Sequence, residues 1–181
     1  MKRTSWLTLL LASGCVSINT NAATPTAIER QLLGAYDELD RDLVMAASVR
    51  GDVRGAPHAW EGLRALALEG RALMRFNEDD VRELKTARCV AEGRSGELLA
   101  RDCSSAELGA RVGRVVEQEN RARRAVVTFA AYAAARERGR TVVAAGDVSE
   151  LWQAYQRLLR QAAQPGDLFE AAPGEFAPVV R

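Results

Sequence analysis

The sequence predicts a mainly α-helical protein with four to five helices, one of them long and central, and a small β-hairpin at the C-terminal end. Apolar residues recur every three or four positions through most of the chain, which is the period of an amphipathic helix. Capping residues and glycines divide this pattern into separate helices. Short apolar runs around a Pro-Gly pair near the C-terminus predict the hairpin.

The first 14 residues have the pattern of a signal peptide. Met1-Lys2-Arg3 is a short basic segment, and residues 6–12 form an apolar run far shorter than the roughly 20 residues that cross a bilayer. Leu11-Ala12-Ser13-Gly14-Cys15 then resembles a bacterial lipobox, although Ala12 stands where leucine is usual. The pattern predicts a lipid anchor on Cys15, followed by a tether over residues 15–25.

Two locations are compatible with this leader. Val16 follows the cysteine, which by analogy with enteric lipoproteins favours the periplasmic face of the outer membrane. Cleavage after Ala22 or Ala23 would instead release a soluble periplasmic protein. Removing Lys2 and Arg3 leaves 23 of the 25 basic residues against 24 acidic ones, a net charge of about −1. That balance does not favour nucleic-acid binding, which needs a basic surface.

The three cysteines are consistent with export. If Cys15 is acylated, Cys89 and Cys103 remain as a pair. A disulfide between them would close a loop of about 15 residues and stabilise the fold by roughly 3 kcal/mol in the chain-entropy model. The alternative is two free buried thiols. We expect no metal site, because the chain has one histidine and no Cys-x-x-Cys motif.

Residues 26–80 predict three helices. Thr26-Ala27-Ile28-Glu29 has the spacing of a capping box, and the first helix ends near Arg50-Gly51. The second runs from about Ala59 to Phe76, and its Gly62 and Gly70 suggest close approach of a neighbouring helix. Asn77 is the expected cap of the third. The predicted apolar stripe of the first helix is Ile28, Leu32, Leu33, Tyr36, Leu39, Leu43, Val44 and Ala47.

The segment over residues 89–99 has no helical period and two glycines, so we expect a loop or a short extended segment. Its Gly93-Arg94-Ser95-Gly96 stretch lacks the P-loop pattern and follows no predicted strand. The sequence therefore predicts no phosphate site there, and no cofactor.

The long helix begins at Ser104 or Ser105 and continues to Gly139. Its middle turn places Glu119, Asn120 and Arg123 along a row of the helix surface where residues that pack against other elements are expected. One interpretation is a buried or interfacial polar network that holds the neighbouring loop. The other is an exposed polar turn, with the apolar face rotated away. We favour the network.

The C-terminal part predicts one more helix and the hairpin. Asp147-Val148-Ser149-Glu150 has capping spacing, and Gln164-Pro165-Gly166 stops the helix that follows. Leu168-Phe169-Glu170 and Glu175-Phe176-Ala177 flank Ala172-Pro173-Gly174, which is the pattern of a small hairpin.

Three segments together resemble the YdbL-type proteins, a family of small exported bacterial proteins built around a domain of unknown function. They are Val90-Ala91-Glu92 with Ser95-Gly96-Glu97-Leu98, then Glu119-Asn120-Arg121-Ala122-Arg123, then Ala162-Ala163-Gln164-Pro165-Gly166. Their order and spacing agree over about residues 81–179. Ala91 stands where the family usually has glycine, and the cysteine pair is not part of the family pattern.

The resemblance implies an envelope protein without an established enzymatic activity. It makes residues 81–181 a YdbL-like region that packs with the helices of residues 26–80 as one domain, in a longer, lipoprotein-type member. It also suggests association with AsmA-like proteins of intermembrane lipid transport. The resemblance thus favours a protein partner in the envelope.

The residues themselves give weak support to catalysis. His58 is the only histidine and lies in a predicted turn, so we expect a loop residue rather than a general base. Glu92 and Glu119 are the one carboxylate pair that a hydrolase could use. A non-enzymatic accessory protein that binds or helps assemble a partner is our leading hypothesis. The alternatives are a carrier or sensor of a small amphiphile such as a lipid, and a carboxylate-dependent hydrolase. The predicted partner-binding residues are Glu92, Ser95, Gly96, Glu119, Asn120, Arg123, Pro165 and Gly166.

Overall fold

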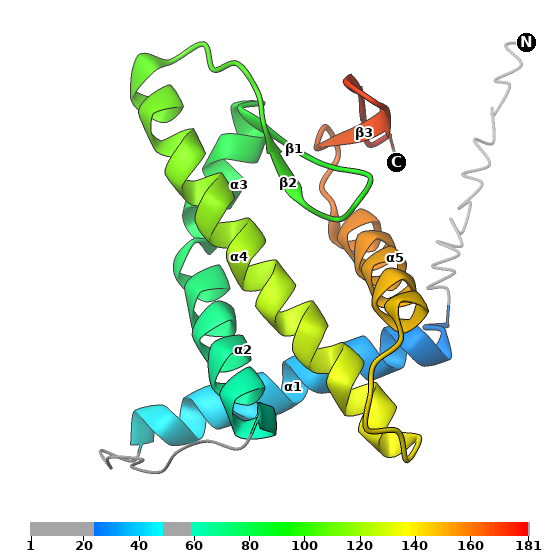
Figure 1. Ribbon diagram of the computed structural model, residues 1–181. Helices are drawn as coiled ribbons and strands as arrows, with labels where there is room; N and C mark the ends of the chain where they lie inside the picture. The colour runs from blue at the N-terminus through cyan, green and yellow to red at the C-terminus, as the bar shows by residue number, and fades with distance from the viewer. Residues whose placement is uncertain (1–23, 49–58, 181) are drawn as a thin grey trace, which may run out of the picture.

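The computed structural model describes residues 24–48 and 59–180, and it confirms a mainly helical fold with one long helix and a C-terminal hairpin (Figure 1). The leader, Cys15, both cleavage sites, the turn over residues 51–57 and His58 lie outside the described residues. In the described part, no helix has the length and apolar character needed to span a bilayer. The helices are α1 (Ala27–Ser48), α2 (Ala59–Phe76), α3 (Glu78–Thr86), α4 (Ala106–Glu137) and α5 (Ala145–Ala162).

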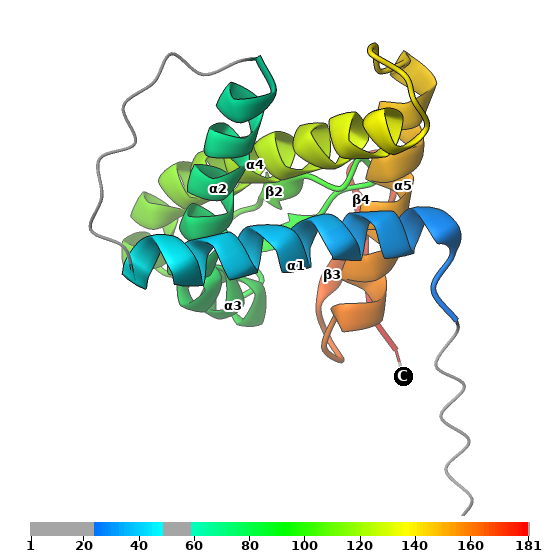
Figure 2. The ribbon, with the colours of Figure 1, turned by 90° about the horizontal axis from the view of Figure 1, so that it is seen from below.

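Helix α4 is the element against which the others pack. Helix α2 runs beside it, α5 lies on its other side, and α1 crosses one end of the bundle (Figures 1 and 2). Leu32 and Leu39 of α1 are fully buried against Val126 and Phe129 of α4. A second cluster joins Leu84 of α3 to the strands and to the first half of α4. The stripe of α1 is narrower than predicted, because Leu33 and Val44 are exposed.

The close approach predicted for α2 occurs at one of its two glycines. A Cβ atom on Gly70 would lie 3.0 Å from the backbone oxygen of Ala122 and 3.3 Å from its Cα, whereas Gly62 has no such neighbour within 4 Å. The prediction is therefore confirmed for Gly70 and wrong for Gly62.

This difference provides a matched pair of substitutions in one helix. We expect Gly70→Ala to destabilise the fold by about 1–3 kcal/mol, because the backbone of α4 must move to admit the methyl group. Gly62→Ala is expected to stabilise it by about 1 kcal/mol through helix propensity alone. Urea unfolding of both variants measures the two effects, and equal shifts would contradict the proposed contact.

The helix starts follow the predicted caps in two of four cases. The Thr26 N–H donates to Glu29 Oε2 at 2.8 Å and the Glu29 N–H donates to Thr26 Oγ1 at 3.2 Å, which is a complete capping box. The Ser105 hydroxyl oxygen accepts from the Leu108 N–H. Asn77 precedes α3 as predicted, but the predicted capping bond is absent, because its backbone is helical and its side chain makes no capping bond. Asp147 is not the N-cap residue of α5 either. It lies in the first turn of the helix, and its carboxylate accepts a hydrogen bond from the N–H of Ala144, the N-cap residue.

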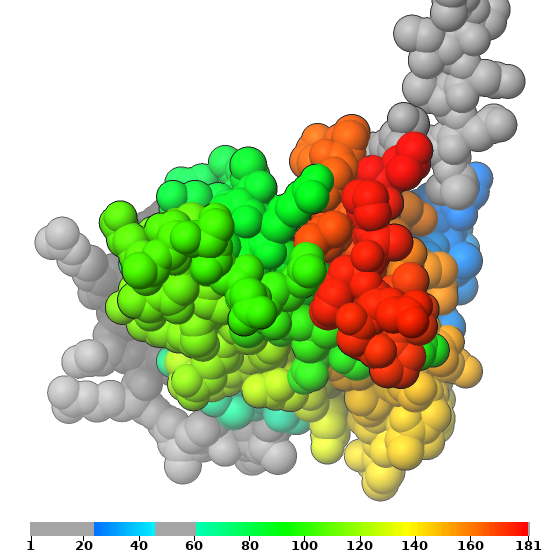
Figure 3. All heavy atoms as spheres, turned by 90° about the horizontal axis from the view of Figure 1, so that it is seen from above, coloured from blue at the N-terminus to red at the C-terminus, as the bar shows by residue number. Residues whose placement is uncertain are grey.

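The strands form a mixed sheet that the sequence did not predict as a unit. Segment 89–99 is a hairpin of β1 (Val90–Glu92) and β2 (Leu98–Ala100), and it joins the predicted hairpin of β3 (Leu168–Ala172) and β4 (Glu175–Pro178). The order is β2-β1-β3-β4, with β1 parallel to β3 through the pair Glu92–Phe169. The two hairpins lie side by side on one face of the molecule (Figure 3). One edge of the C-terminal hairpin is thus already paired.

Candidate functional site

Arg123 is the centre of the polar network predicted on α4. Its side chain is 2% exposed, and its Nε donates to Glu119 Oε1 at 2.9 Å one turn away. Its Nη1 and Nη2 donate to the two carboxylate oxygens of Glu92, at 2.6 and 3.2 Å. Nη1 also donates to the Gly96 carbonyl at 3.0 Å. The guanidinium therefore binds the β1–β2 hairpin to the long helix by a two-pronged ion pair, a geometry that arginine provides and lysine does not.

Lys85 of α3 completes this network. Its Nζ lies 2.6 Å from Glu92 Oε1, so a fully buried carboxylate is held between two cations. Burial raises the pKa of Glu92, but Arg123 and Lys85 together outweigh burial and lower that pKa below its ordinary value. The two carboxylates and two cations balance in charge, and the network links α3, β1 and α4. Such a carboxylate stays ionised, which does not suit the general acid that a carboxylate-dependent hydrolase requires.

Asn120 holds the outer edge of β2 by its side-chain amide. Its Oδ1 accepts from the Leu98 N–H at 2.7 Å, and its Nδ2 donates to the Leu98 carbonyl at 2.8 Å. The amide thus makes the two bonds that a neighbouring strand would make. This contact explains why α4 carries a polar residue, Asn120, about one turn before Arg123.

We expect Asn120→Ala to destabilise the fold by about 1–3 kcal/mol, because two backbone groups of β2 lose their partner. Asn120→Asp provides a graded control: it keeps the acceptor for the Leu98 N–H but loses the donor to the carbonyl. We expect its loss to be intermediate at neutral pH. Chemical denaturation measures both, and an Asn120→Ala variant as stable as the parent would show that the contact contributes nothing.

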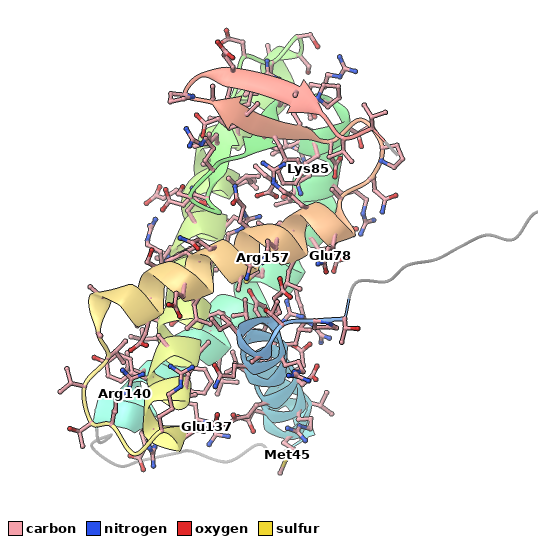
Figure 4. All side chains as sticks on the ribbon, turned by 90° about the vertical axis from the view of Figure 1, so that its right-hand side faces the viewer. Met45, Glu78, Lys85, Glu137, Arg140 and Arg157 are labelled. Atoms are coloured by element: carbon pink, nitrogen blue, oxygen red, sulfur yellow. A yellow bond between two sulfur atoms is a disulfide. The ribbon has the colours of Figure 1, made fainter. Side chains whose placement is uncertain are left out.

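A pocket of about 830 Å³ opens beside the network, between α2–α3 on one side and α5 with the following loop on the other. Arg123 and Glu119 of α4 contribute to its lining, and Lys85 lies between α5 and the sheet when the molecule is viewed from the α5 side (Figure 4). Its lining includes six basic side chains and three acidic ones. The basic side chains are Arg71, Arg75, Arg82, Lys85, Arg88 and Arg123.

Arg88 occupies an unusual backbone position at the rim of this pocket. The Arg88 N–H donates to the Lys85 carbonyl and the Cys89 N–H donates to the Leu84 carbonyl, which is the hydrogen-bond pattern of a Schellman motif after α3. That motif places Arg88 at φ 60°, where glycine is the usual residue. Its side chain is exposed, and within the described residues it has no ion pair. A strained, unpaired arginine at a pocket is a candidate binding residue.

The predicted site residues separate into three groups. Glu92, Glu119 and Arg123 are buried together with Gly96, and of these Glu119 and Arg123 also line the pocket. Asn120 is half-buried against β2, and Ser95 is exposed on the hairpin turn, apart from the pocket lining. Pro165 and Gly166 line the pocket.

Sequence reasoning missed several residues that line the pocket, above all Lys85, Arg88 and Leu159. One available signal was the absence of glycine where α3 must end, since Thr86-Ala87-Arg88-Cys89 closes a helix without it. Lys85 is also the only lysine after the leader.

Cys89 and Cys103 lie at bonding distance and form the predicted disulfide, which joins the start of β1 to the segment before α4. In the described ranges, no group of three His, Cys, Asp or Glu side chains gathers as metal ligands. No protein-family model, curated protein or solved structure matches this chain. The YdbL-type resemblance stays a prediction.

Proposed function

We propose that this chain is a non-enzymatic binding protein of the bacterial cell envelope, and that its binding site is the pocket between α2–α3 and α5. The pocket itself is the observation that supports this proposal. Its volume of about 830 Å³ falls in the range of small-molecule sites. Of its six basic side chains, Arg88 alone has no carboxylate partner among the described residues, so the bound group is expected to be anionic.

The predicted leader supports an envelope location. A basic segment, a short apolar run and a lipobox-like sequence ending at Cys15 favour a lipid anchor at the periplasmic face of the outer membrane. The AsmA-like partner suggested by the resemblance would also be a protein of the cell envelope. Catalysis is not part of the proposal, because Glu92 is bound by two cations and has a lowered pKa.

Site-specific photocrosslinking in intact cells tests the proposal. A benzophenone amino acid replaces Thr86, which is exposed and lines the pocket, and in a second strain it replaces Ser95 on the hairpin turn. We expect an adduct of small mass at position 86 and none of that mass at position 95. Intact-mass spectrometry of the purified protein reads the result.

Charge variants control this experiment. Arg88→Glu should abolish the adduct at position 86, whereas Arg121→Glu, the same change on an exposed residue of α4 outside the pocket lining, should leave it intact. No adduct at position 86 in the parent would contradict the proposal. A protein-sized adduct at position 95 alone would instead favour partner docking through the β1–β2 turn.

A further inference from the structure

We infer that the ligand of this pocket is a small anionic amphiphile: an alkyl chain that carries a carboxylate or phosphate group. The inference rests on the proposed function and adds the chemical class of the ligand. It is based on how charge is distributed between the two walls. The α2–α3 wall and Arg88 supply the cations together with the carboxylate of Glu78, whereas the lining residues of α5 are Tyr155, Leu159 and Ala162, none of them charged. The loop after α5 adds one carboxylate, Asp167.

The acidic group of the ligand is assigned to Arg88 and its neighbours. The other five basic side chains of the lining already have carboxylate partners: Arg71 and Arg75 share Asp40, Arg82 binds Glu78, and Lys85 and Arg123 share Glu92. Within the described residues Arg88 has none, although it occupies a backbone conformation that glycine would adopt at lower cost. An unpaired guanidinium at a rim is a ready partner for carboxylate or phosphate oxygens.

The apolar part of the ligand is assigned to the α5 wall. Leu159 and Ala162 continue into Pro165, and Met74 and Val81 add apolar surface from α2 and α3. The floor contributes no net charge, since Arg123 and Lys85 balance Glu92 and Glu119. Selection for an acid therefore comes from Arg88, and the alkyl chain is assigned to the apolar lining residues rather than to the charged network. The volume suits a single-chain amphiphile rather than a folded partner.

Calorimetric titration of the exported chain carrying Cys15→Ser tests this assignment, with all probes below their micelle-forming concentrations. Dodecanoate and dodecyl phosphate are expected to bind at one site, and each shortening by two carbons should weaken binding about tenfold. Acetate and inorganic phosphate, the headgroups alone, should bind at least 100-fold more weakly than the matching amphiphiles. Dodecyltrimethylammonium, with the same chain and the opposite charge, should bind at least tenfold more weakly.

Three variants locate the two halves of the ligand. Arg88→Gly should weaken dodecanoate about tenfold while Tm stays the same or rises, because glycine relieves the backbone conformation and removes only the guanidinium. Ala162→Glu, at an exposed position of the lining, should also weaken it. Arg121→Ala is the control outside the lining and should change nothing.

The possible failures are distinguishable. Equal binding of the cationic and anionic probes, or an unchanged affinity in Arg88→Gly, would overturn the amphiphile assignment. Absence of dodecanoate and dodecyl phosphate binding, with the position-86 adduct still formed in cells, would overturn it and leave the proposed function standing. Absence of both would reject the two together.

Discussion

Replacing Arg123 by alanine is expected to destabilise the fold by about 3–5 kcal/mol. The substitution leaves Glu92 without its bidentate partner and Glu119 without its hydrogen bond to Arg123 Nε, and both carboxylates are buried. An uncompensated buried charge costs more than the original pair contributes, because both ions have already lost their water. Urea unfolding at neutral pH, followed by far-UV circular dichroism, measures the change.

The neighbouring residue provides the control. Arg124 also forms an ion pair, with Glu97 at 2.8 Å, but its side chain is 54% exposed. We expect Arg124→Ala to cost less than about 1 kcal/mol, because water and salt screen an exposed pair. Similar losses for the two variants would show that burial of the Arg123 network has little energetic consequence.

Removing the disulfide is the second large effect. Replacing both Cys89 and Cys103 by serine should lower the free energy of unfolding by about 3 kcal/mol, since the bond spans 14 positions and restricts the unfolded chain. For a chain of this size that corresponds to a fall in Tm of about 6–12 °C. Differential scanning calorimetry of the parent and the double variant measures it.

Two comparisons separate the disulfide from other causes. A reducing agent added to the parent should produce nearly the same fall in Tm, and it should have no effect on the double variant. Cys15→Ser removes the third cysteine and should leave Tm unchanged, because the Cys89–Cys103 bond is retained. A double variant as stable as the parent would contradict the expected contribution.

The helices could be predicted from the sequence because their signals are local. Each signal is contained within a short stretch of sequence: the capping box at Thr26, the repeat of apolar residues in α4, and the Pro-Gly pair after α5. The mixed sheet could not be predicted, because β1 and β3 are short and pair across the whole of α4 and α5. The cap at Asn77 failed because α2 continues almost directly into α3.

The candidate site was predictable only in part for the same reason. The polar row of Glu119, Asn120 and Arg123 conflicted with the helical period, and that conflict indicated a network. Its partner Glu92 lies 31 residues away from Arg123, and only the family-like motif indicated it. The pocket depends on how α3 and α5 face each other, which no local pattern in the sequence records.

The amide of Asn120 also limits how copies of this protein can associate. It occupies the outward N–H and carbonyl of Leu98, the first residue of a three-residue strand, so β2 offers almost no free edge to another chain. The edge strand at the other end of the described sheet is β4, which is four residues long and ends at Pro178, a residue with no N–H to donate. A sheet with one usable edge can pair with a second copy about a two-fold axis, but it has no second edge from which to continue. Edge pairing would therefore end at a closed dimer and could not extend into a filament.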